Sequence, residues 1–139
     1  MATLSVPATL EQLASVNSFI VQNTPSEFAP LIGNIQLVAE EILVNILSYA
    51  YPEGEMGKAE VVCRSVFFDG APFLCLAVRD WGSPFNPFAE TAAPDLTLDT
   101  ESRPIGGLGI HLIKSVTAHQ AYSWTDNSNL IETYFSLPA

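Results

Sequence analysis

The chain has 139 residues, of which 48% are hydrophobic and 14% charged, so we expect one domain spanning residues 1–139 and exclude wholesale disorder. The formal net charge of −10 argues against nonspecific binding to nucleic acid, because an acidic surface repels phosphates. The sequence has neither an apolar run of the roughly eighteen residues that a bilayer span requires nor a signal-peptide pattern at its start, so we expect a cytoplasmic protein with no membrane partner.

The first half of the chain predicts one strand and two helices. Residues 2–6 alternate and include β-branched side chains, which favours a strand. Thr9 followed by Gln12 is a capping-box pattern, and the apolar residues after it have helical spacing. A second, longer helix is predicted to begin between residues 26 and 30 and to end at Ala50, because its apolar positions form a wide stripe.

The second half predicts four strands and one helix around a long loop. In chain order these are strands 58–68 and 73–79 around a turn at 69–72, a loop at about 81–107, a helix at 108–117, and strands 119–125 and 129–137 around a turn at 126–128. A structureless loop of this length in a small domain is usually functional, so we expect a lid. The order favours an α+β fold, a two-layer sandwich of a mixed, mostly antiparallel sheet with helices on one face.

The two cysteines, Cys63 and Cys75, fall on neighbouring predicted strands. In a cytoplasmic protein such a pair is expected to stay reduced and to pack as small apolar residues. Zinc binding is disfavoured, because these cysteines with His111 and His119 offer too few ligands at these spacings.

Glu41 and Asn45 lie one turn apart on the second predicted helix, so their side chains project from the same side. A solvated polar stripe would explain such a pair taken alone. The functional interpretation is a carboxylate that orients a reacting hydroxyl or water, beside an amide oxygen that helps to hold a hard cation. The strongly apolar surroundings favour this interpretation, because an unpaired polar group there is costly.

Asp80 and Gly82 follow directly on a predicted apolar strand. A carboxylate at a strand end can accept a hydrogen bond from an exocyclic amine such as that of adenine. A glycine two residues later lets the backbone approach a ring closely. An ordinary turn is the simpler interpretation of this segment by itself.

Gly106, Gly107 and Gly109 form a glycine loop immediately before the amphipathic part of the next predicted helix. Such a loop can deliver backbone N–H groups to an anion at a helix start, and a flexible hinge with a helix cap is the alternative. The loop does not follow the first strand of a βαβ unit and lacks a Gly-Lys-Ser/Thr ending, so Rossmann and Walker phosphate sites are excluded.

Together, in this order, the three segments resemble the motifs of the GHKL ATPase superfamily. Residues 38–51 resemble its N box, residues 80–87 its first glycine box and residues 106–113 its second, so the resemblance covers nearly the whole chain. The segments are most similar to the branch of anti-sigma-factor serine kinases of bacteria. The sequence lacks the phosphoacceptor helices and sensor segments of a sensor histidine kinase, which disfavours that branch.

This resemblance implies ATP and Mg²⁺ as cofactors and a role for each matching residue. Glu41 would be the general base on the substrate serine, and Asn45 would coordinate Mg²⁺. Asp80 would read the adenine amine, Gly82 would line the base, and Asn129 would lie near the adenine. The remaining matches would wrap the phosphates in the lid, with Arg103 reaching the terminal phosphate; these are Arg103, Gly106, Gly107, Leu108 and Gly109.

The resemblance also implies partners. The substrate would be a serine of a small anti-anti-sigma factor of the STAS type, a sigma factor would be a further partner, and the protein would be a homodimer. Tyr49, Asn86 and His111 depart from the usual pattern of the branch, which leaves room for divergent partners. Two alternatives stay open at this point: a module that sequesters a regulator without kinase activity, and a stand-alone ATPase.

Overall fold

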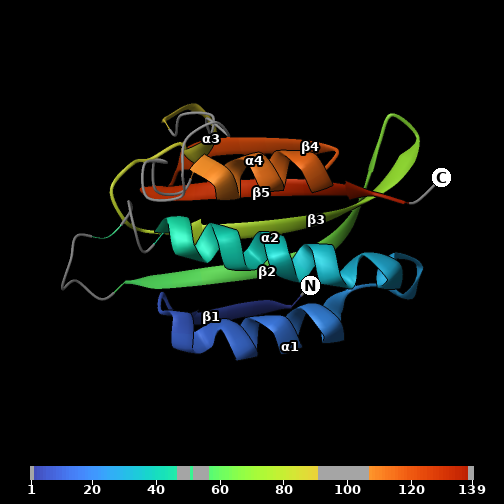
Figure 1. The fold of residues 1–139 in the computed structure, drawn as a ribbon, viewed down its shortest axis with the longest axis horizontal. Helices are drawn as coiled ribbons and strands as arrows, with labels where there is room; N and C mark the ends of the chain where they lie inside the picture. Colours follow the sequence, from blue (N-terminus) through green and yellow to red (C-terminus); the bar gives the residue numbers. More distant parts are fainter. Residues whose placement is uncertain (1, 47–50, 52–56, 91–106, 138–139) are drawn as a thin grey trace.

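The protein is described by a computed structural model in which residues 2–46, 51, 57–90 and 107–137 are placed. Five strands form a single sheet in the order β1-β2-β3-β5-β4, and all four pairings are antiparallel. Figure 1 shows α1, α2 and α4 on the same face of this sheet. The predicted α+β sandwich is therefore confirmed. The strands are β1 (Thr3–Pro7), β2 (Lys58–Phe68), β3 (Ala71–Asp80), β4 (His119–Thr125) and β5 (Ser128–Ser136).

The first two helices begin later than the sequence pattern predicts, because each is preceded by a 3-10 turn. Thr9 makes no side-chain capping hydrogen bond, so the predicted capping box is wrong. Pro30 has no backbone N–H to donate and lies in the 3-10 segment that precedes the second helix. The helical segments are η1 (Leu10–Gln12), α1 (Leu13–Asn23), η2 (Ser26–Leu31), α2 (Ile32–Asn45), α3 (Pro87–Glu90) and α4 (Gly107–Val116).

Both hairpin turns are tighter than predicted. Asp69 and Gly70 have φ angles of 52° and 76°, and Asp126 and Asn127 have φ angles of 53° and 56°. Two consecutive residues with positive φ make a two-residue turn whose twist matches that of the flanking strands. The strands therefore extend into the predicted turns, and β3 begins at Ala71.

The core lies between the helices and one face of the sheet. Alternate residues of the strands point toward the helices, and Val61, Leu76 and Phe135 are almost fully buried there. Ile35 and Ile113 cover them from α2 and α4. Each such side chain stabilises the fold by roughly 1.5–3 kcal/mol through its burial. The packing fixes how α2 and α4 sit over the ends of the strands.

The two cysteines are buried and unbonded to each other, as expected. Burial raises the pKa of the Cys63 thiol to about 12 and that of Cys75 to about 11. Both therefore stay protonated at neutral pH. Among the described residues, no helix is long and apolar enough to cross a bilayer.

Candidate functional site

Most of the described site residues lie toward one end of the sheet. The C-terminal ends of α2 and β3 lie there, together with the N-terminal ends of α4 and β5 (Figure 1, left). These ends carry Glu41, Asn45, Asp80, Gly109 and Asn129, which come from distant parts of the sequence. Arg103 and Gly106 lie outside the described residues, as does most of the predicted lid, residues 91–106.

The described part of the predicted lid is not structureless. Residues Pro87–Glu90 form the short helix α3. The Asn86 side-chain oxygen accepts a hydrogen bond from the Phe88 N–H at 3.0 Å. Asn86 is one of the departures from the related pattern, and its side chain satisfies a free N–H at the start of this helix.

Asp80 lies at the end of β3 with only 2% of its surface exposed. Its Oδ1 atom accepts hydrogen bonds from the Gly82 N–H at 3.0 Å and from the Asn129 side chain at 2.9 Å. Burial raises the pKa of this carboxyl, while the two donors act in the opposite direction. Both of these donors bond to Oδ1, so within the described residues the second oxygen remains available as an acceptor.

Asn129 holds the loop that follows Asp80. Its amide nitrogen donates to Asp80 and to the Ser83 carbonyl, each at 2.9 Å. Its Oδ1 accepts from the Phe85 N–H at 3.0 Å and from the Tyr122 hydroxyl at 2.6 Å. These four bonds use the full capacity of the side chain. Asn129 therefore holds Asp80 and its loop in place, and its location near the adenine stays a prediction.

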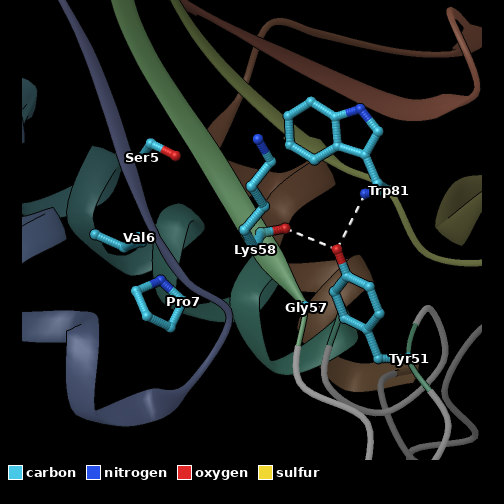
Figure 2. A pocket seen from close by; sticks show the side chains of 7 residues that line it. All are labelled: Ser5, Val6, Pro7, Tyr51, Gly57, Lys58 and Trp81. Carbon is cyan, nitrogen blue, oxygen red and sulfur yellow. Dashed lines mark hydrogen bonds between the residues drawn. The ribbon is translucent and has the colours of Figure 1, made fainter.

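Tyr51 supports the same loop from the other side, and no motif of the sequence indicates this role. Its hydroxyl accepts a hydrogen bond from the Trp81 N–H at 3.0 Å and donates to the Lys58 carbonyl at 2.7 Å (Figure 2). A β-carbon at Gly57 would overlap the Tyr51 ring, so a side chain there would push the ring out of this position. The hydroxyl thereby ties the residue after Asp80 to the start of β2.

A cavity of about 540 Å³ lies beside this bridge and is separate from the Asp80 carboxylate. Lys58 and Asp80 project from opposite faces of the sheet, because Asp80 pairs with the next residue, Ala59. In the cavity the Lys58 ammonium lies 4.3 Å from the centroid of the Trp81 ring. The cavity is lined by Ser5, Val6, Pro7, Tyr51, Gly57, Lys58 and Trp81 (Figure 2).

The Glu41 and Asn45 pair lies in the last turns of α2. The Asn45 amide nitrogen donates to the Glu41 backbone carbonyl at 2.9 Å. Its Oδ1 atom is buried and has no hydrogen-bond partner among the residues that the structure describes. Burial, followed by the nearby charge of Glu40, raises the pKa of the Glu41 carboxyl. The pair thus combines an unpaired acceptor with a carboxyl group that holds a proton more readily than usual.

These features fit a magnesium ion bound together with a nucleotide. A buried carbonyl oxygen without a donor is costly unless a ligand completes it, and Mg²⁺ prefers such hard oxygen ligands. Within the described part of the chain, no three His, Cys, Asp or Glu side chains are close enough to form a metal site. Asn45 would therefore hold an ion that takes its other ligands from phosphates and water, which is common for Mg²⁺.

Gly109 lies within α4, not in a loop before the helix. The helix begins at Gly107, so the first turn consists of Gly107, Leu108 and Gly109. A β-carbon at position 109 would overlap Oε2 of Glu41 and lie 3.2 Å from its carboxyl carbon. The first N–H groups of a helix have no partners within it, so this turn can still face an anion.

The chain is similar to known proteins over most of its length. The family model for the histidine kinase-like ATPase domain matches residues 6–134. Among solved structures, the histidine kinase domain of the blue-light activated histidine kinase from Erythrobacter litoralis EL346 is similar, with 16% identity and a TM-score of 0.48. That alignment covers 91% of this chain and 60% of that chain. No curated protein matches the sequence.

Proposed function

The chain belongs to the family of histidine kinase-like ATPase domains, and from this premise we propose that it transfers the γ-phosphate of ATP to a serine of a partner protein. The observation that carries the proposal is that α2 carries, one turn apart, the Glu41 carboxyl and an Asn45 oxygen that is buried without a partner among the described residues. The partner we propose is an anti-anti-sigma factor of the STAS type, with a sigma factor as a second partner. We further propose that the protein is a cytoplasmic homodimer.

The adenine would bind at Asp80. The free oxygen of this buried carboxylate would accept a hydrogen bond from the exocyclic amine, and Gly82 would allow the ring to approach the backbone. A buried carboxylate discriminates strongly between purines, because a base that presents a carbonyl there leaves the carboxylate without a donor. We therefore propose a preference for ATP over GTP.

The phosphates would lie between α2 and the start of α4. Asn45 would hold Mg²⁺, which neutralises phosphate charge during the transfer. The backbone of Gly107, Leu108 and Gly109 would face the phosphates, and we propose that Arg103 and Gly106 complete this part of the site. With few cations in a chain of net charge −10, backbone N–H groups and the metal must supply most of the neutralisation.

The transfer step assigned to Glu41 is proton removal from the serine hydroxyl. The raised pKa makes this carboxylate a better proton acceptor than an ordinary glutamate. As the proton moves to Glu41, the serine oxygen bonds to the γ-phosphorus and the bond to the bridging oxygen breaks, which leaves ADP. Positioning the two reactants supplies most of the acceleration in phosphoryl transfer.

Incubation with [γ-³²P]ATP, Mg²⁺ and a STAS-domain protein from the same genome tests the proposal. Label on a serine of the partner supports the kinase. Release of labelled phosphate at a rate independent of the partner indicates an ATPase in which Glu41 activates water. Tight binding of the partner without label indicates a nucleotide-dependent sequestering module. Either of the last two results overturns the kinase assignment. Sedimentation of the purified protein tests the homodimer.

A further inference from the structure

The first turn of α4 contacts the candidate base on α2. The two helices pack against each other on the same face of the sheet (Figure 1), and Ile110 and Ile113 anchor α4 in the core. Gly109, the residue before the first anchor, faces the Glu41 side chain. The position of α4 and the position of the carboxyl are therefore linked through one residue.

A side chain at position 109 would occupy the space that the carboxyl now fills. The added β-carbon would overlap Glu41 Oε2 and stand 3.2 Å from the carboxyl carbon and 3.7 Å from the Glu41 β-carbon. The overlapping atom is the far end of a flexible side chain, so the carboxyl can rotate away while the helices stay in place. The fold therefore tolerates alanine, and the displacement falls on the proposed reacting atom.

We propose that Gly109 is a positioning residue for Glu41: the missing side chain allows the carboxyl to lie against the first turn of α4. Gly109 would then have two roles, phosphate contact through its backbone and positioning of Glu41. The inference rests on the proposed role of Glu41 as the base. Gly33 offers the contrast, because it is also helical but has nothing within 4 Å of its added β-carbon.

The pKa of Glu41 reports the position of its carboxyl group, because it depends on the surroundings of that group. Burial is the main cause of its raised pKa, and Glu40 is the charged neighbour that adds to it. The titratable residues of the described α4, His111 and Lys114, are exposed. Rotation of the carboxyl into water would therefore return its pKa toward the ordinary value for glutamate.

The experiment compares Gly109→Ala with Gly33→Ala as the matched control. In G109A the pKa of Glu41, followed by ¹³C NMR of the side-chain carboxyl, should fall, whereas G33A should leave it unchanged. For transfer to the STAS partner, G109A should lower kcat by roughly tenfold to a hundredfold, because small misplacements of reacting groups are costly. The KM for ATP should change less than threefold. An unchanged Glu41 pKa in folded G109A overturns the inference.

Shortening the base provides a second test. Glu41→Asp withdraws the carboxyl by one methylene and makes room for a β-carbon at 109. The fold-loss in kcat caused by G109A should therefore be smaller in the E41D background than in the wild type. Equal losses in both backgrounds overturn the inference. If G109A alone does not fold, recovery of folding in E41D/G109A supports the inference and failure of the double variant to fold overturns it. A wild-type protein without transfer activity refutes the proposed function instead, while the NMR titration still tests the contact.

Discussion

The two ends of the proposed nucleotide site differ in how far the protein completes them. At the adenine end, Asp80 and Asn129 are 2% and 1% exposed, and Asn129 uses all its hydrogen-bonding groups within the protein. At the phosphate end, Asn45 Oδ1 is buried without a partner among the described residues, and Glu41 has a raised pKa. Among the described residues, protein groups complete the hydrogen bonding of Asn129 at the first end, whereas at the second end a buried oxygen has no protein partner, and a ligand would take that place under the proposed function.

This difference indicates that the adenine end selects the base and that the phosphate end serves the reaction. A preorganised hydrogen-bonding group discriminates between bases because it cannot adapt to the wrong one. An unpaired oxygen and a partly desolvated carboxyl are unfavourable in the free protein and gain from bound cation and substrate. We therefore expect substitutions at the adenine end to affect stability and nucleotide affinity, and those at the phosphate end to affect the reaction.

The largest effect is expected at Glu41. Replacing it by glutamine keeps the shape of the side chain and removes the proton acceptor, so transfer should fall by roughly 10²- to 10⁴-fold. ATP affinity by calorimetry should change less than threefold. Glu40→Gln is the matched control and should retain transfer, because Glu40 only contributes charge near the base. Transfer by E41Q at the wild-type rate would show that the assigned base is wrong.

The next largest effect is expected from Asn129→Ala. The change leaves Asp80, the Ser83 carbonyl and the Phe85 N–H without their buried partner, which should cost on the order of 3 kcal/mol of unfolding free energy. Tyr122→Phe removes one of the four bonds and should cost about 1 kcal/mol. Urea unfolding of both variants measures the two losses of unfolding free energy, of which that of N129A should be about three times larger. Equal losses would contradict the central role of Asn129.

Asp80→Asn separates affinity from stability. Loss of the charged acceptor should weaken ATP binding by roughly thirtyfold, whereas Asp69→Asn in the exposed turn should have no effect.

The pKa of Asp80 is raised in the folded protein, so the contribution of this carboxyl to stability is fully present below its unfolded pKa of about 4 and is lost as pH rises through the folded pKa. The unfolding free energy of D80N relative to wild type should therefore increase between pH 4 and 7. ATP binding by D80N at the wild-type affinity would refute the adenine site.

Asn45→Leu should have the smallest effect on stability of these variants. It tests most directly whether the phosphate end, unlike the adenine end, depends on a bound ion. Leucine has the same branching and number of side-chain heavy atoms and removes the buried oxygen, so the unfolding free energy should change by no more than about 1 kcal/mol. The increase in ATP affinity on adding Mg²⁺ should fall by roughly tenfold, because the variant lacks the Asn45 oxygen that is proposed to bind the ion. Asn34→Leu, at an exposed position of the same helix, should leave that increase intact. A full magnesium effect in N45L would remove Asn45 from the metal site.

The element order and the main site residues could be predicted because their signals are local. Alternation of apolar residues indicates strands, and the four-residue spacing of Glu41 and Asn45 places both on one side of a helix. The position of Asp80 at a strand end follows from where the apolar run stops. The tight Asp69-Gly70 turn could also have been predicted, since Asp-Gly between two strands favours a two-residue hairpin.

The supporting contacts could not be predicted because they join residues far apart in the chain. Asn129 and Asp80 are 49 positions apart, and Tyr51 and Trp81 are 30 apart. Gly109 shows the same limit, because glycine spacing predicts a flexible loop and says nothing of a neighbouring helix. Such contacts arise only when packing brings separate elements to one end of the sheet.

The positions of the two tryptophans give the protein a spectroscopic property. The chain has two tryptophans, and both flank the Asp80–Asn129 pair: Trp81 follows Asp80 in the chain, and Trp124 is the strand partner of Asn129. Trp81 also lies against the Lys58 ammonium, whereas Trp124 is 42% exposed. The intrinsic fluorescence of the unlabelled protein therefore originates beside the proposed adenine pocket, and nucleotide titrations can be followed without a dye.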